Sequence, residues 1–352
     1  MTISIKPVID KLINNNFQCY LCSYSAIDLY LNSKISPDYS YLITDATLIE
    51  LFKLFNNVEF YKIPFFDAVI EHNETKILIF TSEHGSFPDF PFNVQYFLFD
   101  CKKGIFKTFE NSFDNIKNAS MKISSKSSPY LIPEKAKLTS KYDFICNDPL
   151  LKISPLPVNI HENYQKEILV SILEGEHADK GLEILLQSGF IEKFWPEIYE
   201  MTKIEHVKDF HPEGNVWLHT LESLKFLKKR NLLNALSLFL HDIGKAFCDS
   251  TKDKPFYGHA EIGAGIAKKF LKRLNFSNDF IERVSFLIKY HMLPPALNKI
   301  PEYKLSKIVS HPDFEAIFEI YRADISSSYK PLEKFFEIKR YYRKYLKASN
   351  YI

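Results

Sequence analysis

The chain has 352 residues, 46% of them hydrophobic, and a net charge of only +2, so it can bury the cores of two or three domains and gives no argument for a general polyanion binder. No apolar run reaches the roughly 18 residues of a membrane span, and the amino end lacks the features of a signal peptide; we therefore expect a cytoplasmic protein without membrane contact. Five scattered cysteines favour reduced thiols over a disulfide framework.

The first 109 residues predict an α/β domain. Short β-rich runs such as FQCYL and KILIFT alternate with helical stretches such as ATLIELFKLFN. Within this region Cys19 and Cys22 form a single CxxC, at a predicted strand that enters a helix. Four thiolate ligands would need a second CxxC, so packed thiols are favoured over a zinc site.

The remaining chain predicts three further parts. Residues 110–159 are rich in Ser, Lys, Asn and Pro and predict a linker or irregular segment. Residues 160–205 predict a helical neck, and residues 206–352 predict a helical domain that ends in a basic, aromatic helix. The expected fold is therefore multidomain α+β, with an α/β head followed by an all-α neck and body.

Histidines and carboxylates recur along the predicted helices after residue 206. Each residue alone could be a hydrogen-bonded core side chain, but several helices deliver such groups near an end or on an inward face. Imidazole nitrogen together with carboxylate oxygen suits Mn, Fe, Co, Ni or Zn, with Mg also allowed. The predicted ligands of one or two such divalent ions are His219, His241, Asp242, His259, His291 and Asp324.

This series, centred on the pair in SLFLHDIGKA, resembles the HD superfamily of metal-dependent phosphohydrolases. The resemblance implies a first metal held by His219, His241, Asp242 and Asp324 and a second held by His259 and His291, with Asp242 bridging. A hydroxide on such cations attacks phosphate esters. Lys245 matches the lysine common after this motif and is expected to meet the bound phosphate, the alternative being a solvated lysine.

The head carries a second resemblance. The runs YLCSYSAIDLYLNS and TDATLIELFKLF are similar to the bacterial tRNA nucleotidyltransferase and poly(A) polymerase family, whose members often place an HD domain behind the polymerase head. That family opens with Gly-Gly and Val-Arg-Asp. Here Ser23-Tyr24 replaces the glycine pair and Ile27 replaces the arginine, while Asp28 remains.

Further family motifs of the head are incomplete. The Asp-x-Asp that holds magnesium against the triphosphate falls on Asp38 and Ser40 or on Tyr39 and Tyr41, and neither alignment leaves two carboxylates. DFPFNVQYFLFD lacks both arginines of the family pattern, and NDPLLK has Leu151 where an arginine belongs. The head therefore resembles a degenerate nucleotidyltransferase.

From these patterns we predict an enzyme: a metal-dependent phosphohydrolase with Asp242 and Lys245 as catalytic residues and an inactive head. Its substrate would be a phosphate ester, namely a nucleotide, a cyclic nucleotide or an RNA terminus, and tRNA or another RNA is a candidate partner. One alternative is a tRNA CCA-adding or poly(A) polymerase. The other is a noncatalytic RNA-binding protein in which metal holds the helices together.

Overall fold

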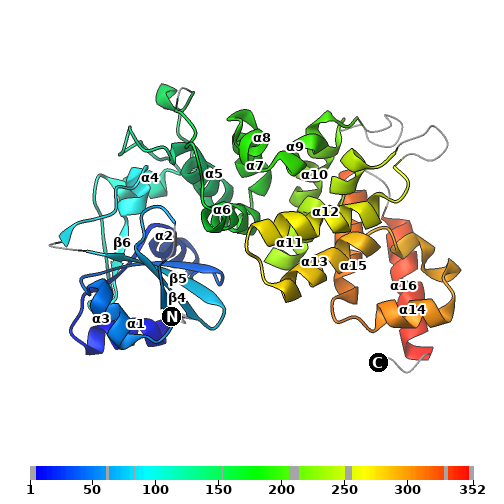
Figure 1. Ribbon diagram of the computed structural model, residues 1–352, viewed down its shortest axis with the longest axis horizontal. Helices are drawn as coiled ribbons and strands as arrows, with labels where there is room; N and C mark the ends of the chain where they lie inside the picture. Colours follow the sequence, from blue (N-terminus) through cyan, green and yellow to red (C-terminus); the bar gives the residue numbers. More distant parts are fainter. Residues whose placement is uncertain are drawn as a thin grey trace. The chain divides into compact units, whose positions relative to one another are not determined.

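The computed structural model describes residues 5–60, 63–82, 85–152, 154–205, 214–249, 256–328 and 332–348. The chain forms two compact units, Met1–Ile172 and Leu173–Ile352. The first unit, coloured blue to green in Figure 1, contains the β-sheet, and the second, green to red, is helical. The mixed α and β fold expected from the sequence is confirmed.

The first unit is built on a seven-stranded sheet with the order β3-β4-β5-β2-β1-β6-β7. Only β2 and β5 pair in parallel; the other neighbours are antiparallel. The strands are β1 (Cys19–Cys22), β2 (Tyr39–Thr44), β3 (Val58–Glu59), β4 (Ala68–His72), β5 (Thr75–Thr81), β6 (Leu98–Asp100) and β7 (Ile105–Lys107). All six residues of β2 are buried, as its central place in the sheet requires.

Among the residues that the structure describes, six α-helices and the 3-10 helices η2 and η3 accompany the sheet of the first unit. They are α1 (Lys6–Asn14), α2 (Ser23–Asn32), α3 (Leu48–Leu54), η2 (Asn93–Tyr96), α4 (Ser112–Lys117), α5 (Leu131–Tyr142), η3 (Pro149–Lys152) and α6 (Glu162–Glu174), the last crossing the boundary between the units. Thr47 and Glu50 form a capping box that starts α3. The turn from β1 into α2 places Ser23 at a φ of 49°, a left-handed conformation that favours glycine.

Residues 110–159 depart from the expectation of a linker or irregular segment, because they contain α4 and α5. Helix α5 is buried on most of its sides, with Leu131, Ala136 and Leu138 among its buried apolar residues. The abundant Lys, Ser and Pro of the segment hid this helix in the sequence. The helix also buries Glu134 and Lys137, two charged side chains that composition alone assigns to solvent.

In the ranges that the structure describes, the second unit is built from helices, with one isolated β-bridge between Glu205 and Asn215. It comprises α7 (Ala178–Gln187), α8 (Phe190–Phe194), α9 (Pro196–Tyr199), η4 (Glu200–Lys203), α10 (Val216–Lys225), α11 (Leu232–Leu240), η5 (Ile243–Phe247), α12 (His259–Arg273), α13 (Asn278–Tyr290), η6 (Pro294–Lys299), α14 (Glu302–Val309), α15 (Phe314–Ser327) and α16 (Glu333–Ala348). Helix α11 is apolar on nearly every side and forms the centre, where it contacts α10, α13 and α15.

Local signals explain where these helices begin and how closely they approach. The side chains of Asn215, Asn231 and Ser277 cap α10, α11 and α13 by accepting a backbone N–H. Gly244 packs directly against Gly263 of α12; a Cβ on Gly244 would lie 2.0 Å from the carbonyl oxygen of His259. This contact excludes any side chain at Gly244.

Two weaker sequence features also receive a structural assignment. Cys19 and Cys22 are buried thiols at the ends of β1, and no group of metal-type ligands in the described ranges includes either of them. In α16 the rings of Phe335 and Tyr342 are buried in the apolar core of the second unit, as expected of an amphipathic helix. No helix within the described residues has the length and apolar composition to cross a membrane.

Candidate functional site

The six predicted ligands come together in the second unit. His219 lies within α10, His241 and Asp242 directly follow α11, His259 opens α12, His291 directly follows α13, and Asp324 lies within α15. The side chains of His219, His241 and His291 are fully buried and Asp242 is nearly so. Five stretches separated by up to 105 residues therefore deliver their polar groups to one place.

One half of the cluster gathers around Asp242 Oδ2. This oxygen lies 3.3 Å from His241 Nε2 and 3.7 Å from His219 Nε2. Asp324 Oδ1 lies 3.0 Å from His219 Nε2 and 3.9 Å from His241 Nε2. Two imidazole nitrogens and Asp242 Oδ2 thus have the mutual spacing of metal ligands, and Asp324 Oδ1 lies beside both imidazoles. Nitrogen and carboxylate oxygen are the donor types of a transition-metal site.

The other half of the cluster gathers around the second oxygen of the same carboxylate. Asp242 Oδ1 lies 3.5 Å from His259 Nε2 and 3.8 Å from His291 Nε2, and these two nitrogens are 3.3 Å apart. His219, His241 and Asp242 form one group with the spacing of metal ligands, and Asp242, His259 and His291 form a second. Asp242 belongs to both groups and is placed to bridge two ions.

Backbone carbonyls fix which nitrogen of three imidazoles faces the centre. The Nδ1 atoms of His241, His259 and His291 lie 2.7, 2.9 and 2.7 Å from the carbonyl oxygens three residues earlier. A carbonyl oxygen can only accept, so Nδ1 carries the proton and Nε2 presents a lone pair to the cluster. Ser327 Oγ, 3.2 Å from His219 Nδ1, is a supporting contact that the sequence analysis missed, although it stands one turn after Asp324.

The electrostatics keep these groups in the protonation state of metal ligands. Burial, together with the neighbouring His241, lowers the pKa of His291 to about 3, and burial also lowers the pKa of His259. Burial alone would raise the pKa of Asp242, but the nearby His241 and Lys245 hold it well below its ordinary value. At neutral pH this part of the cluster offers neutral imidazoles and an ionised carboxylate.

Buried His241 Nε2 has no hydrogen-bond partner among the described residues. Such an orphaned acceptor is costly unless a further group satisfies it, and a cation at the common point would do so. The donor set therefore fits a divalent metal ion. Lys245 Nζ lies 2.6 Å from Asp242 Oδ2, so the structure pairs this ammonium with the bridging carboxylate.

The head contains a different polar cluster at the place where the sequence lacks the nucleotidyltransferase carboxylates. Tyr24 follows the left-handed Ser23, and Tyr41 lies on β2. The Tyr24 hydroxyl donates to Glu134 at 2.7 Å and the Tyr41 hydroxyl donates to Glu167. Lys137 Nζ lies between the two glutamates, 2.6 Å from Glu134 Oε1 and 2.8 Å from Glu167 Oε1.

We call this second cluster the head network: Tyr24, Tyr41, Glu134, Lys137, Tyr164 and Glu167. All six side chains are buried. The cavity beside them has a volume of about 10 Å³, which is the space of a single water molecule. The sequence analysis missed the network because its members lie far apart in the chain.

The residues kept from the family pattern in DFPFNVQYFLFD have structural contacts. Asn93 Nδ2 donates to Asn115 Oδ1 at 2.9 Å, and Asn93 Oδ1 accepts from the backbone of Lys122. Asp89 accepts a hydrogen bond from Ser125 Oγ at 2.9 Å. These side chains therefore hold the segment between β7 and α5 against η2 and the residues that precede it.

Comparisons with known proteins agree with this architecture. The family model described as HD domain matches residues 216–313. These residues of the helical unit are therefore similar to an HD domain. A multifunctional CCA protein of Shewanella denitrificans is 29% identical over 130 residues, which are 36% of this chain and 31% of that protein. A CC-adding tRNA nucleotidyltransferase of Thermus thermophilus is 30% identical over 145 residues, 39% of this chain and 32% of that protein.

The aligned part of the chain thus spans about a third of the length of each of these curated relatives. Among solved structures, a tRNA-processing enzyme in its apo form 2 aligns with a TM-score of 0.50 at 14% identity, over 95% of this chain and 94% of that one. This likeness supports the fold, a head built on a β-sheet followed by a helical body.

The prediction of a phosphohydrolase with an inactive head is wrong. The relatives that the chain matches are named as a multifunctional CCA protein and a CC-adding tRNA nucleotidyltransferase, and not as phosphohydrolases. The error arose because the ligand set identifies a metal centre but not the reaction at it, since a fold and its metal donors do not define an activity. The catalytic roles expected of Asp242 and Lys245 depended on hydrolysis and are withdrawn with it.

Proposed function

We propose that this chain acts on tRNA as a protein of the tRNA nucleotidyltransferase type, at the 3′ end of its RNA partner. The observation that carries the proposal is the sequence similarity to a multifunctional CCA protein and a CC-adding tRNA nucleotidyltransferase, supported by the likeness of the whole fold to a tRNA-processing enzyme. Nucleotide addition to tRNA is the activity that the relatives favour.

A second candidate, tRNA binding without nucleotide addition, has a specific observation in its favour. Tyr24 and Tyr41 stand where the family's glycine turn and one candidate carboxylate position fall, and the head network fills the space beside them. Two-metal nucleotidyl transfer needs carboxylates that hold magnesium against the triphosphate. In this candidate the head presents or binds the RNA and the HD centre stabilises the body.

An incorporation assay separates the candidates. The full-length protein would be incubated with labelled CTP or ATP and with tRNA that ends one, two or three nucleotides short, in magnesium and in manganese. Incorporation supports nucleotide addition, and tRNA binding in a gel shift without incorporation supports the second candidate. If the protein neither extends nor binds tRNA, while a control nucleotidyltransferase does both, the proposal fails.

We further propose that the HD cluster, which is the group of His219, His241, Asp242, His259, His291 and Asp324, holds one or two divalent ions. The mixed nitrogen and oxygen donors favour Mn, Fe, Co, Ni or Zn, and Mg is also allowed. His219, His241, Asp242 and Asp324 would hold the first, and Asp242, His259 and His291 the second. Such an ion supplies positive charge among buried acceptors. Elemental analysis of the purified protein should find one or two ions per chain, lost when His241→Ala and Asp242→Ala are combined.

A further inference from the structure

Two cysteines lie opposite each other at one end of the head sheet. In the antiparallel pair of β1 and β6, Tyr20 is the partner of Asp100, so the next pair outward is Cys19 and Cys101. The backbone N–H of Cys101 donates to the carbonyl oxygen of Cys19 at 3.0 Å, so the register continues to these residues. Opposed residues of an antiparallel pair have Cα atoms about 4.5–5.5 Å apart, within the roughly 4.4–6.8 Å that a disulfide spans.

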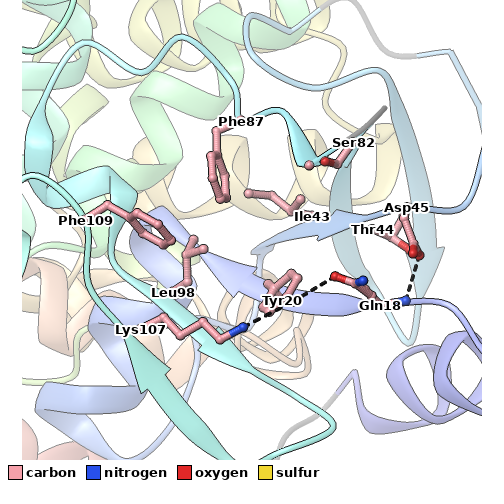
Figure 2. Close-up of a pocket in the computed structure, with 11 residues that line it drawn as sticks. Gln18, Tyr20, Ile43, Thr44, Asp45, Ser82, Phe87, Leu98, Lys107 and Phe109 are labelled. Carbon is pink, nitrogen blue, oxygen red and sulfur yellow. Dashed lines mark hydrogen bonds between the residues drawn. The ribbon is translucent and has the colours of Figure 1, made fainter.

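The side chains of this cysteine pair lie on the same face of the sheet. Successive residues of a strand alternate between the two faces, whereas opposed residues share one face. Figure 2 shows Tyr20 beside a cavity on one face, so Cys19 and Cys101 point to the other. Their thiols are in contact there, and this contact, together with burial, raises the pKa of Cys19 well above its ordinary value.

Cys22, the other cysteine of β1, is less well placed to pair with Cys101. It stands opposite Leu98, three residues beyond Cys19 and therefore about 10 Å further along the strand. The alternation of side chains also turns it to the opposite face from Cys19. The geometry of the strands therefore favours Cys19 as the partner of Cys101.

The two thiols differ in their access to water. Cys19 is buried, whereas Cys101 is partly exposed at the start of the turn between β6 and β7. Asp100 Oδ1 accepts the backbone N–H groups of Lys102 and Lys103 at 3.1 and 3.0 Å, which fixes this turn and the position of Cys101 beside it. An oxidant in solution therefore meets Cys101 first, and Cys19 reacts only with a group that is already at its side.

We propose that Cys19 and Cys101 are a reversible modification site, at which hydrogen peroxide converts the two thiols into one intramolecular disulfide. The Cys101 sulfur attacks one peroxide oxygen and the O–O bond breaks. The products are a sulfenic acid and, with the Cys101 proton, a first water. The Cys19 sulfur then attacks the Cys101 sulfur. The S–S bond forms, the S–O bond breaks, and hydroxide leaves with the Cys19 proton as a second water. A dithiol reductant restores both thiols.

The disulfide closes a long loop in the head. Strands β1 to β6, six of the seven strands of the sheet, lie within the stretch that it closes. A cross-link across so long a loop reduces the conformational freedom of the unfolded chain. The oxidised protein should therefore unfold at a temperature about 5–10 °C higher than the reduced protein.

The test treats the reduced full-length protein with hydrogen peroxide, alkylates the remaining thiols and maps the peptides by mass spectrometry without reduction. A peptide that joins Cys19 to Cys101 should appear, and dithiothreitol should remove both this peptide and the rise in unfolding temperature. Cys101→Ser should abolish both. Cys248→Ser is the matched control and should keep both, because Cys248 is also partly exposed but is the sole cysteine of residues 173–352.

A second variant tests the order of the two steps. Cys19→Ser removes the thiol that attacks the sulfenic acid, so a sulfenic-acid probe should label Cys101 severalfold more than in the parent protein. The peptide map of the parent protein decides the proposal even if this variant does not fold. Three results overturn it: Cys101 oxidised to sulfinic acid without a cross-link, a cross-link from Cys101 to Cys22 or to a second chain, or oxidation of Cys248 while Cys101 stays reduced. None of these results depends on tRNA.

Discussion

The two buried polar clusters of this chain are built on opposite principles. In the head network every charged group meets its counterpart, since Lys137 contacts both Glu134 and Glu167 and tyrosine hydroxyls donate to the remaining oxygens. In the HD cluster the lone pairs converge and buried His241 Nε2 stays unsatisfied. A network whose polar groups all have hydrogen-bond or charged partners stabilises a fold by itself, whereas converging acceptors require a cation. Of these two clusters, only the HD cluster therefore has the character of a binding centre.

The largest expected effect tests the self-sufficiency of the head network. Lys137→Met leaves two buried carboxylates without their cation and should lower the free energy of unfolding by about 3–5 kcal/mol. Urea unfolding of the full chain, with a probe in the head, measures the loss. Lys203→Met removes a solvent-exposed lysine that is paired with Glu200 and should change nothing measurable. Equal stability of the two variants would contradict the structural role of the network.

The second effect tests whether the HD cluster depends on a cation. Adding Mn²⁺ or Zn²⁺ to chelator-treated protein should stabilise it by about 2.7 kcal/mol at a hundredfold excess over the dissociation constant. His241→Ala should remove the gain because a central ligand is lost. His311→Ala should keep it, because His311 stacks on Phe286 outside the cluster. Thermal unfolding with and without metal gives the measurement, and a gain that survives in His241→Ala would place the ion elsewhere.

A third effect concerns the backbone beside the HD cluster. Gly244→Ala forces a Cβ against His259 and Gly263 and should destabilise the second unit by about 1–3 kcal/mol or more, with weaker metal binding because His259 shifts. Gly265→Ala is the matched control, since its Cβ would meet nothing within 4 Å and should gain about 0.5–1 kcal/mol. Denaturant midpoints of both variants decide the question, and a harmless Gly244→Ala would refute the close contact.

The smallest effect tests the turn that leads into the head network. Ser23→Gly should stabilise the head by up to about 1 kcal/mol, because glycine adopts the left-handed φ of 49° without steric cost. Ser33→Gly provides a second measurement at a residue of φ 56° on the surface. If Ser33→Gly stabilises the protein and Ser23→Gly does not, the buried Ser23 side chain contributes more to stability than its backbone strain removes.

The difference between the HD cluster and the head network also explains which of the two could be predicted from the sequence. The HD ligands were predictable because few other structures collect histidines and carboxylates on successive apolar helices, and the structure brings all six together. The head network was not predictable, because Tyr41 and Glu167 lie 126 residues apart and tyrosine and lysine carry no ligand signature. Helix α5 was missed because its buried Glu134 and Lys137 interrupt the apolar pattern.

The carbonyl contacts of the HD histidines make helix length a determinant of ligand direction. His241 and His291 stand directly after the last residues of α11 and α13, where the final carbonyls of a helix lack partners within it, and each imidazole uses one of them to aim its other nitrogen inward. Because each residue turns a helix by about 100°, one residue inserted into either helix would swing the imidazole out of the cluster. The residue at which each of these two helices ends thus determines the direction of its histidine, and with it the geometry of the cluster, as much as the identity of the side chains does.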